Sequence, residues 1–181
     1  MKFPSFITPN TLTVTRIALI PLGVYALFLD GGDNPDYQIA AWCIFFILGM
    51  TDIVDGKWAR SSNRITPLGA FLDPVADKAL IGAAMISLSL LDRFPWWITI
   101  LILTREIGIT IFRLLVIKGG VIPASKGGKI KTLLQNFSVG FYILPLPEAL
   151  HTPRDILLAI AIALTFITGY QYLKDVVKSK P

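Results

Sequence analysis

The chain has 181 residues, of which 54% are hydrophobic and 16% are charged, and its mean hydropathy is +0.64. Soluble domains carry roughly 25% charged residues, so this composition excludes a disordered chain and an ordinary water-soluble globule, while one cysteine and one histidine exclude a disulfide framework and a histidine-rich metal site. In so apolar a chain the net charge of +5 is more typical of cytoplasmic loops near anionic lipid than of a nucleic-acid partner.

Long apolar stretches follow one another along the whole chain. A stretch of about 20 apolar residues predicts a membrane-spanning helix, whereas the strands of a membrane β-barrel would alternate in polarity over about 10 residues. In chain order the predicted spans are 11–29, 38–57, 68–91, 95–117, 132–150 and 155–173. We therefore expect an all-α integral membrane protein with six transmembrane helices. Residues 1–181 are expected to form a single domain, with 1–9 as a short interfacial segment.

The basic residues at the termini, in the connections and at the adjoining span ends lie mainly on one side of the predicted membrane. That side holds both termini and the connections between spans two and three and between spans four and five. Its basic residues are Lys2, Lys57, Arg60, Arg64, Lys118, Lys126, Lys129, Lys131, Lys174, Lys178 and Lys180. The opposite side carries only Arg93 and Arg154. Because cytoplasmic loops are enriched in lysine and arginine, both termini are predicted to be cytoplasmic.

Four aspartates lie at the predicted cytoplasmic ends of the second and third spans, namely Asp52, Asp55, Asp73 and Asp77. The spacings of three and four residues put each pair on one helix face, and the short antiparallel connection brings both pairs to one depth. Four close carboxylates would repel one another at low dielectric, so the cluster predicts bound cations. Oxygen ligands favour Mg²⁺ or Mn²⁺. Taken singly, each aspartate could instead be a pairing or capping residue.

The residues around these aspartates form a specific pattern. Residues 52–60 read D-I-V-D-G-K-W-A-R, and residues 69–77 read G-A-F-L-D-P-V-A-D. The pattern resembles the signature of the CDP-alcohol phosphotransferase family, D-x-x-D-G-x-x-A-R followed by G-x-x-x-D-x-x-x-D. The resemblance implies transfer of a phosphatidyl or similar group from a CDP-linked donor to an alcohol, with release of CMP. It also implies two divalent cations held by the first three aspartates, Asp77 as the general base, and a homodimer.

Small and polar residues near the aspartates are predicted to bind the CDP-linked donor. The predicted donor-binding residues are Asn10, Thr13, Asp52, Gly56, Ala59, Arg60 and Gly69. Gly56 lacks a side chain, so a nucleotide can approach the helix there, and Arg60 can donate two hydrogen bonds to a phosphate. Asn10, Thr13 and Arg16 share one face of the first span at three-residue spacing. The alternative for the small residues is close helix packing in lipid.

A second cluster is basic, and its residues are Arg105, Arg113, Lys129 and Lys131. Arginine at membrane depth requires an anion, which we expect to be the phosphate of the acceptor substrate. The alternative is that Glu106 neutralises one of the arginines. The runs N-T-L-T-V-T-R at 10–16, T-R-E at 104–106 and G-K-I-K-T at 128–132 resemble one branch of the family. In that branch the donor is CDP-diacylglycerol, the acceptor is sn-glycerol 3-phosphate and the product is phosphatidylglycerol phosphate.

Other functions remain open at this point. Within the family, the acceptor could be inositol phosphate or a second phosphatidylglycerol. A membrane prenyltransferase also uses aspartates, Mg²⁺ and a pyrophosphate, but its aspartate motifs would lie further apart. A cation transporter would favour acidic residues near mid-membrane, often in paired repeats. Release of CMP from CDP-diacylglycerol separates the transferase from the last two. For the transferase we expect a bacterial cell membrane, with the active site facing the cytoplasm.

Overall fold

The computed structural model describes residues 9–61, 67–116 and 126–178, with side chains at 11–51, 69, 72–111 and 130–171. Every regular element in these residues is helical, which confirms the all-α prediction. The long helices are α1 (Pro9–Phe28), α2 (Pro35–Ser61), α3 (Pro67–Leu90), α4 (Trp96–Val116), α5 (Lys126–Ile143) and α6 (His151–Lys178). The short 3-10 helices η1 (Leu29–Gly32) and η3 (Glu148–Leu150) precede α2 and α6.

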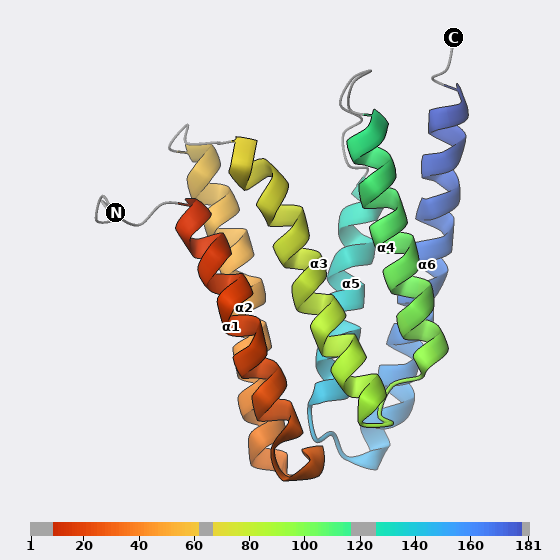
Figure 1. Ribbon diagram of the computed structural model, residues 1–181. Helices are drawn as coiled ribbons and strands as arrows, with labels where there is room; N and C mark the ends of the chain where they lie inside the picture. The colour runs from red at the N-terminus through yellow and green to blue at the C-terminus, as the bar shows by residue number, and fades with distance from the viewer. Residues whose placement is uncertain (1–8, 62–66, 117–125, 179–181) are drawn as a thin grey trace. The chain divides into compact units, whose positions relative to one another are not determined.

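The chain divides into two compact units. The first unit comprises residues 1–93 and 143–145 and contains α1, α2 and α3. The second comprises residues 94–142 and 146–181 and contains α4, α6 and all but the last residue of α5. Within the first unit α1 packs against both α2 and α3, which also contact each other, and Figure 1 shows these three helices side by side. Within the second unit α4 packs against α6.

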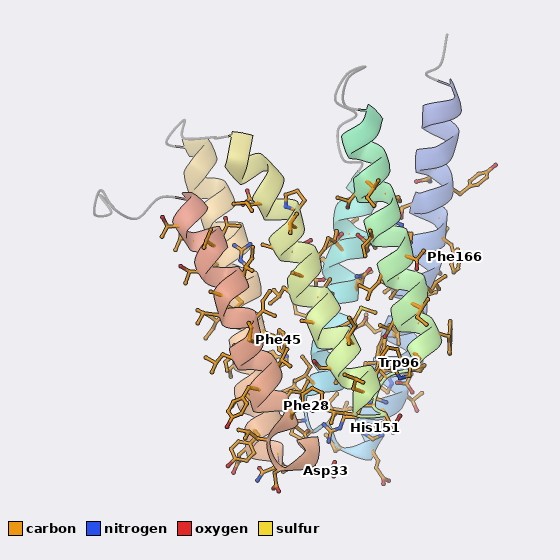
Figure 2. The ribbon with its side chains drawn as sticks, in the orientation of Figure 1. Phe28, Asp33, Phe45, Trp96, His151 and Phe166 are labelled. Carbon is orange, nitrogen blue, oxygen red and sulfur yellow. The ribbon has the colours of Figure 1, made fainter. Side chains whose placement is uncertain are left out.

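The helices α1 and α2 approach each other closely in the second half of α1, and a turn with a short 3-10 helix joins them. A Cβ added to Gly23 would lie 3.1 Å from the ring of Phe45, so the missing side chain permits the approach (Figure 2). At the turn Gly32 has φ of +86°, a conformation that favours glycine. Asp33 then pairs with Arg93 at 3.1 Å, joining this turn to the segment after α3. These contacts fix the end of the first unit that lies far from the start of α3.

The predicted fifth span, 132–150, is wrong at its C-terminal end. The helix α5 ends at Ile143, residues 144–147 are not helical, and η3 follows. Pro145 and Pro147 have no backbone N–H to donate, and each disfavours the helical conformation in the residue before it. The helix instead begins earlier than predicted, at Lys126, and α6 begins at His151.

Two segments within the described residues are long and apolar enough to cross a bilayer, Thr11–Gly32 and Glu148–Gln171. They correspond to the first and sixth predicted spans. Large apolar side chains on these segments are exposed, among them Tyr25 at 64% and Phe166 at 58%, and Figure 2 shows Phe166 on α6. Exposed apolar surface on this scale is what contact with lipid requires. Bilayer crossing by the other four helices stays a prediction.

Candidate active site

Two of the four predicted aspartates lie one helical turn apart on α3. Both Asp73 and Asp77 are partly buried, and their spacing puts them on one face of the helix. The hydroxyl of Thr13, on α1, donates a hydrogen bond of 2.8 Å to Oδ1 of Asp73. The Nζ of Lys78 lies 3.4 Å from Oδ2 of Asp77. Each carboxylate therefore has a donor beside it, a neutral one at Asp73 and a cationic one at Asp77.

The other two aspartates lie in the last part of α2, which continues as a helix to Ser61. The structure describes the backbone of this part but not its side chains from position 52 onward. The predicted site residues affected are Asp52, Asp55, Gly56, Ala59 and Arg60. The backbone confirms that positions 52 and 55 share a helix, so their three-residue spacing puts them on one face. The gathering of all four carboxylates at one point stays a prediction.

The face of α1 that carries Thr13 contacts both aspartate-bearing helices. Thr13 and Arg16 are each 1% exposed. Arg16 donates from Nε to the hydroxyl of Thr51 on α2 at 3.3 Å, and that hydroxyl donates to the carbonyl oxygen of Leu48 at 2.7 Å. Sequence reasoning assigned this face to the donor substrate and missed the contact of Thr13 with Asp73. The three-residue spacing of Thr13 and Arg16 indicates that they share a face, but it carries no information about the partner of Thr13 on α3.

The described acidic side chains fit a hard cation. Both aspartates of α3 offer carboxylate oxygen, the ligand that Mg²⁺ and Mn²⁺ prefer, and the chain has one histidine and one cysteine in total. Gly69, one turn before Asp73, is buried. Within the part of the chain whose side chains are described, no group of three or more His, Cys, Asp or Glu residues gathers. Asp52 and Asp55 lie outside that part, so the predicted four-carboxylate centre is not tested by this observation. The side chain of Asn10 lies outside it as well.

A buried ion cluster lies in the second unit. Glu106 of α4 is 4% exposed, and its Oε1 lies 2.7 Å from Nη1 of Arg105. The same oxygen pairs with Nζ of Lys131 on α5, a lysine that is 1% exposed. Nη2 of Arg105 donates to the hydroxyl of Thr168 on α6 at 3.0 Å. The cluster therefore links α4, α5 and α6 around one carboxylate.

Two of the four residues predicted to bind the acceptor phosphate belong to this cluster. Arg105 and Lys131 meet at Glu106, so the pairing that the sequence offered as an alternative does form. One carboxylate shared by two cations leaves one positive charge in excess among these three side chains. Among the residues whose side chains are described, the buried Nε of Arg105 has no hydrogen-bond partner. The other two predicted residues, at positions 113 and 129, lie in α4 and α5, and their side chains fall outside the described residues. Thr168 gave no signal in the sequence.

Comparison with known families decides the relationship that the motif indicated. The sequence model described as CDP-alcohol phosphatidyltransferase matches residues 6–167. The chain belongs to the CDP-alcohol phosphatidyltransferase family. The matched range contains the whole aspartate motif and the three charged residues of the buried ion cluster, Arg105, Glu106 and Lys131.

Relatives in this family are similar to the chain over most of its length. The protein named "Probable phosphatidylglycerophosphate synthase" from Mycobacterium tuberculosis H37Rv is 49% identical over 164 residues, which cover 91% of this chain and 78% of the relative. The "CDP-diacylglycerol--glycerol-3-phosphate 3-phosphatidyltransferase" of Bacillus subtilis is 39% identical over 180 residues, which cover 92% of this chain and 93% of that protein. The protein of the same name from Haemophilus influenzae is 37% identical over 175 residues, which cover 93% of this chain and 92% of that protein.

Proposed function

We propose that this chain transfers the phosphatidyl group of CDP-diacylglycerol to sn-glycerol 3-phosphate, giving phosphatidylglycerol phosphate and CMP. The observation that carries the proposal is similarity over nine-tenths of the chain to relatives named for this reaction. The complete aspartate motif within the family match supports it. In the reaction an acceptor hydroxyl oxygen bonds to the phosphorus of the phosphatidyl group. The bond from that phosphorus to the CMP oxygen breaks, and the hydroxyl proton passes to a base.

The proposed cofactors are two divalent cations, Mg²⁺ or Mn²⁺. Their proposed ligands are Asp52 and Asp55 on α2 and Asp73 on α3, and Asp77 of the same carboxylate cluster is proposed as the base. Bound cations would clamp the pyrophosphate of the donor and stabilise the charge that develops on the departing phosphate. The oxygen chemistry of the described carboxylates supports this choice of metal.

Asp77 is the proposed general base that takes the proton of the acceptor hydroxyl. Its neighbour Lys78 lies 3.4 Å from one carboxylate oxygen, and the Asp77 side chain is 31% exposed, so a substrate hydroxyl can reach it. Asp73, one turn earlier, accepts a hydrogen bond from Thr13 instead. The two aspartates of α3 are therefore held differently, which supports different roles for them.

The proposed site for the acceptor phosphate consists of Arg105, Arg113, Lys129 and Lys131. Support comes from the two cations that share the Glu106 carboxylate and from the buried Nε of Arg105, which has no hydrogen-bond partner among the described residues. Glu106 would hold Arg105 and Lys131 in position for a phosphate dianion. An acceptor without a phosphate, such as serine or choline, would not need a phosphate-binding site of this kind.

The donor nucleotide is proposed to lie along the motif of α2 and the start of α3. The proposed contacts are Asn10, Thr13, Asp52, Gly56, Ala59, Arg60 and Gly69. All six long helices are proposed to span a bacterial cell membrane as one catalytic domain, with both termini and the site on the cytoplasmic side. The proposed assembly is a homodimer. The distribution of lysine and arginine supports this orientation.

A panel of acceptors tests the proposed function. Purified protein with CDP-diacylglycerol and Mg²⁺ or Mn²⁺ is expected to release CMP when sn-glycerol 3-phosphate is added, and the lipid product is identified by mass spectrometry. Inositol phosphate and phosphatidylglycerol serve as the competing acceptors. CMP release with one of these in place of glycerol 3-phosphate would assign another acceptor. A protein that releases CMP with none of them is not this transferase, and the prenyltransferase and transporter functions would then have to be tested.

A further inference from the structure

The inward face of α1 carries two polar side chains that the packing of apolar helices does not require. Thr13 and Arg16 lie three residues apart, and each is 1% exposed. A buried hydroxyl costs free energy unless it is hydrogen-bonded, and a buried guanidinium costs more. Both have partners in the first unit, one on each of the two helices that carry the aspartates.

Thr13 contacts Asp73 directly. Its hydroxyl donates to Oδ1 over 2.8 Å, between residues that are 60 positions apart in the chain. A hydrogen bond of this length fixes the rotation of the carboxylate about its Cβ–Cγ bond, so Oδ2 is directed as well. Since α1 packs along α3, the hydroxyl is supplied by a helix that carries no aspartate of the motif.

Arg16 makes a similar hydrogen bond from α1 to α2. Its Nε donates to the Thr51 hydroxyl at 3.3 Å, and that hydroxyl is anchored to the carbonyl oxygen of Leu48 at 2.7 Å. Thr51 directly precedes Asp52 in the sequence. One face of α1 is thus bonded to α3 at Asp73 and to α2 one residue before Asp52.

We propose that Thr13 is a positioning residue for the metal ligand Asp73, and that α1 acts through it as a template for the aspartate centre. The inference rests on the proposed function, because it takes Asp73 as a ligand of a divalent cation. Hydrogen-bond partners of metal ligands orient those ligands, and their loss typically weakens metal binding by about 10–100-fold. Thr13 therefore acts on the metal, through Asp73, and not on the nucleotide alone.

The experiment measures Mn²⁺ binding by electron paramagnetic resonance on the purified full chain in detergent, without substrates. Thr13→Val keeps the shape of the side chain and removes the donor, so its dissociation constant for Mn²⁺ is expected to rise about 10-fold or more. Thr13→Ser keeps the hydroxyl and is expected to bind Mn²⁺ like the wild type. Thr15→Val, at an exposed position of the same helix, is the matched control and is expected to change nothing.

A purely structural role for Thr13 predicts a different result. In that case Thr13→Val lowers the melting temperature while the folded fraction binds Mn²⁺ as tightly as the wild type, and the proposal is overturned. It is also overturned if Thr13→Ser is as impaired as Thr13→Val, since the hydroxyl is then not what matters. Should the valine variant not fold, Thr13→Ala replaces it, because the smaller side chain cannot overpack the site.

The same preparations separate this inference from the proposed function. CMP release from CDP-diacylglycerol is assayed on the wild type with each acceptor of the panel. If the wild type binds Mn²⁺ and Thr13→Val weakens binding, but no acceptor gives CMP, the reaction is wrong and the positioning role stands. If the wild type makes phosphatidylglycerol phosphate and Thr13→Val binds Mn²⁺ normally, the reaction stands and the positioning role is wrong.

Discussion

The two aspartates of α3 are chemically identical, but their neighbours differ. Asp73 accepts a hydrogen bond from a buried hydroxyl on another helix, which restrains its orientation. Asp77 lies beside the ammonium group of Lys78, and its side chain is 31% exposed. A metal ligand benefits from a fixed orientation, whereas a base must reach a substrate that arrives from outside. These surroundings favour Asp73 as ligand and Asp77 as base.

Replacing Asp77 by asparagine tests this division. Asp77→Asn is expected to lower kcat by about 10²–10⁴-fold, the usual contribution of a general base, while Mn²⁺ and the CDP-linked donor still bind. CMP release and Mn²⁺ binding are the two measurements. Asp36→Asn, at an exposed position of α2, is the control and should leave both unchanged. Near-normal turnover of Asp77→Asn would remove Asp77 from the role of base.

Single residues also mark the limit of what the sequence could predict about the site. The motif spacing identified Asp73 and Asp77 without any structure, because helical periodicity alone puts them on one face. It could not identify Thr13 as the partner of Asp73, since 60 residues separate them and the contact depends on how α1 packs. The sequence offered Glu106 as the partner of one of the two arginines, and Arg105 is an arginine that pairs with it. The second cation, Lys131, and the hydroxyl of Thr168 come from other helices.

At the scale of elements, apolar length predicted the helices well where turn residues bound them clearly. The third predicted span, 68–91, differs by one residue at each end from α3. The fifth predicted span is too long at its C-terminal end because the apolar residues continue through Leu144 and Leu146. The helix itself ends before them, since Pro145 and Pro147 alternate with these leucines. Hydropathy measures burial preference and carries no information about a missing N–H.

The end of α5 is secured by a small cluster that contains Tyr142. Its hydroxyl donates to Oδ1 of Asp155 on α6 at 2.7 Å, and the same carboxylate accepts from Nε of Arg154 at 2.9 Å. The Arg154 guanidinium lies 4.0 Å from the centre of the Tyr142 ring. The Phe94 ring packs edge-on against the same ring, with 4.9 Å between the two ring centres. The cluster joins α5, α6 and the segment before α4, so it compensates for the early end of the helix.

Removing only the hydroxyl of Tyr142 tests the strength of this cluster. Tyr142→Phe keeps the ring contacts and loses the hydrogen bond to Asp155, so we expect a loss of about 1 kcal/mol in the free energy of unfolding. Thermal unfolding in detergent measures the loss, and CMP release per folded molecule should not change. Tyr170→Phe is the matched control, because Tyr170 is 70% exposed. Equal stability of the two variants would mean that the hydrogen bond from Tyr142 to Asp155 contributes nothing.

At the scale of the whole molecule, the proposed groups divide between the two units. The aspartates of the motif belong to the first unit, and the cluster around Glu106 belongs to the second. Within each unit, contacts between helices far apart in the sequence build the arrangement, which is why motif spacing could predict the residues and not their partners. The membrane orientation, in contrast, is predicted from the loops alone. It assigns one side of the bilayer to η3 and the other to residues 62–66.

Labelling of single cysteines tests that orientation. Cys43→Ser removes the one native thiol, and Glu148→Cys or Asn63→Cys then introduces one thiol on each predicted side. In intact bacterial cells a membrane-impermeant maleimide should label position 148, whose side chain is exposed in η3, while position 63 should react only after permeabilisation. Lysine and arginine hold cytoplasmic loops inside during insertion, so the basic connection that contains position 63 should stay protected. The reverse labelling pattern would move both termini, and the aspartates with them, to the outer face, where a nucleotide-linked donor from the cytoplasm could not reach them.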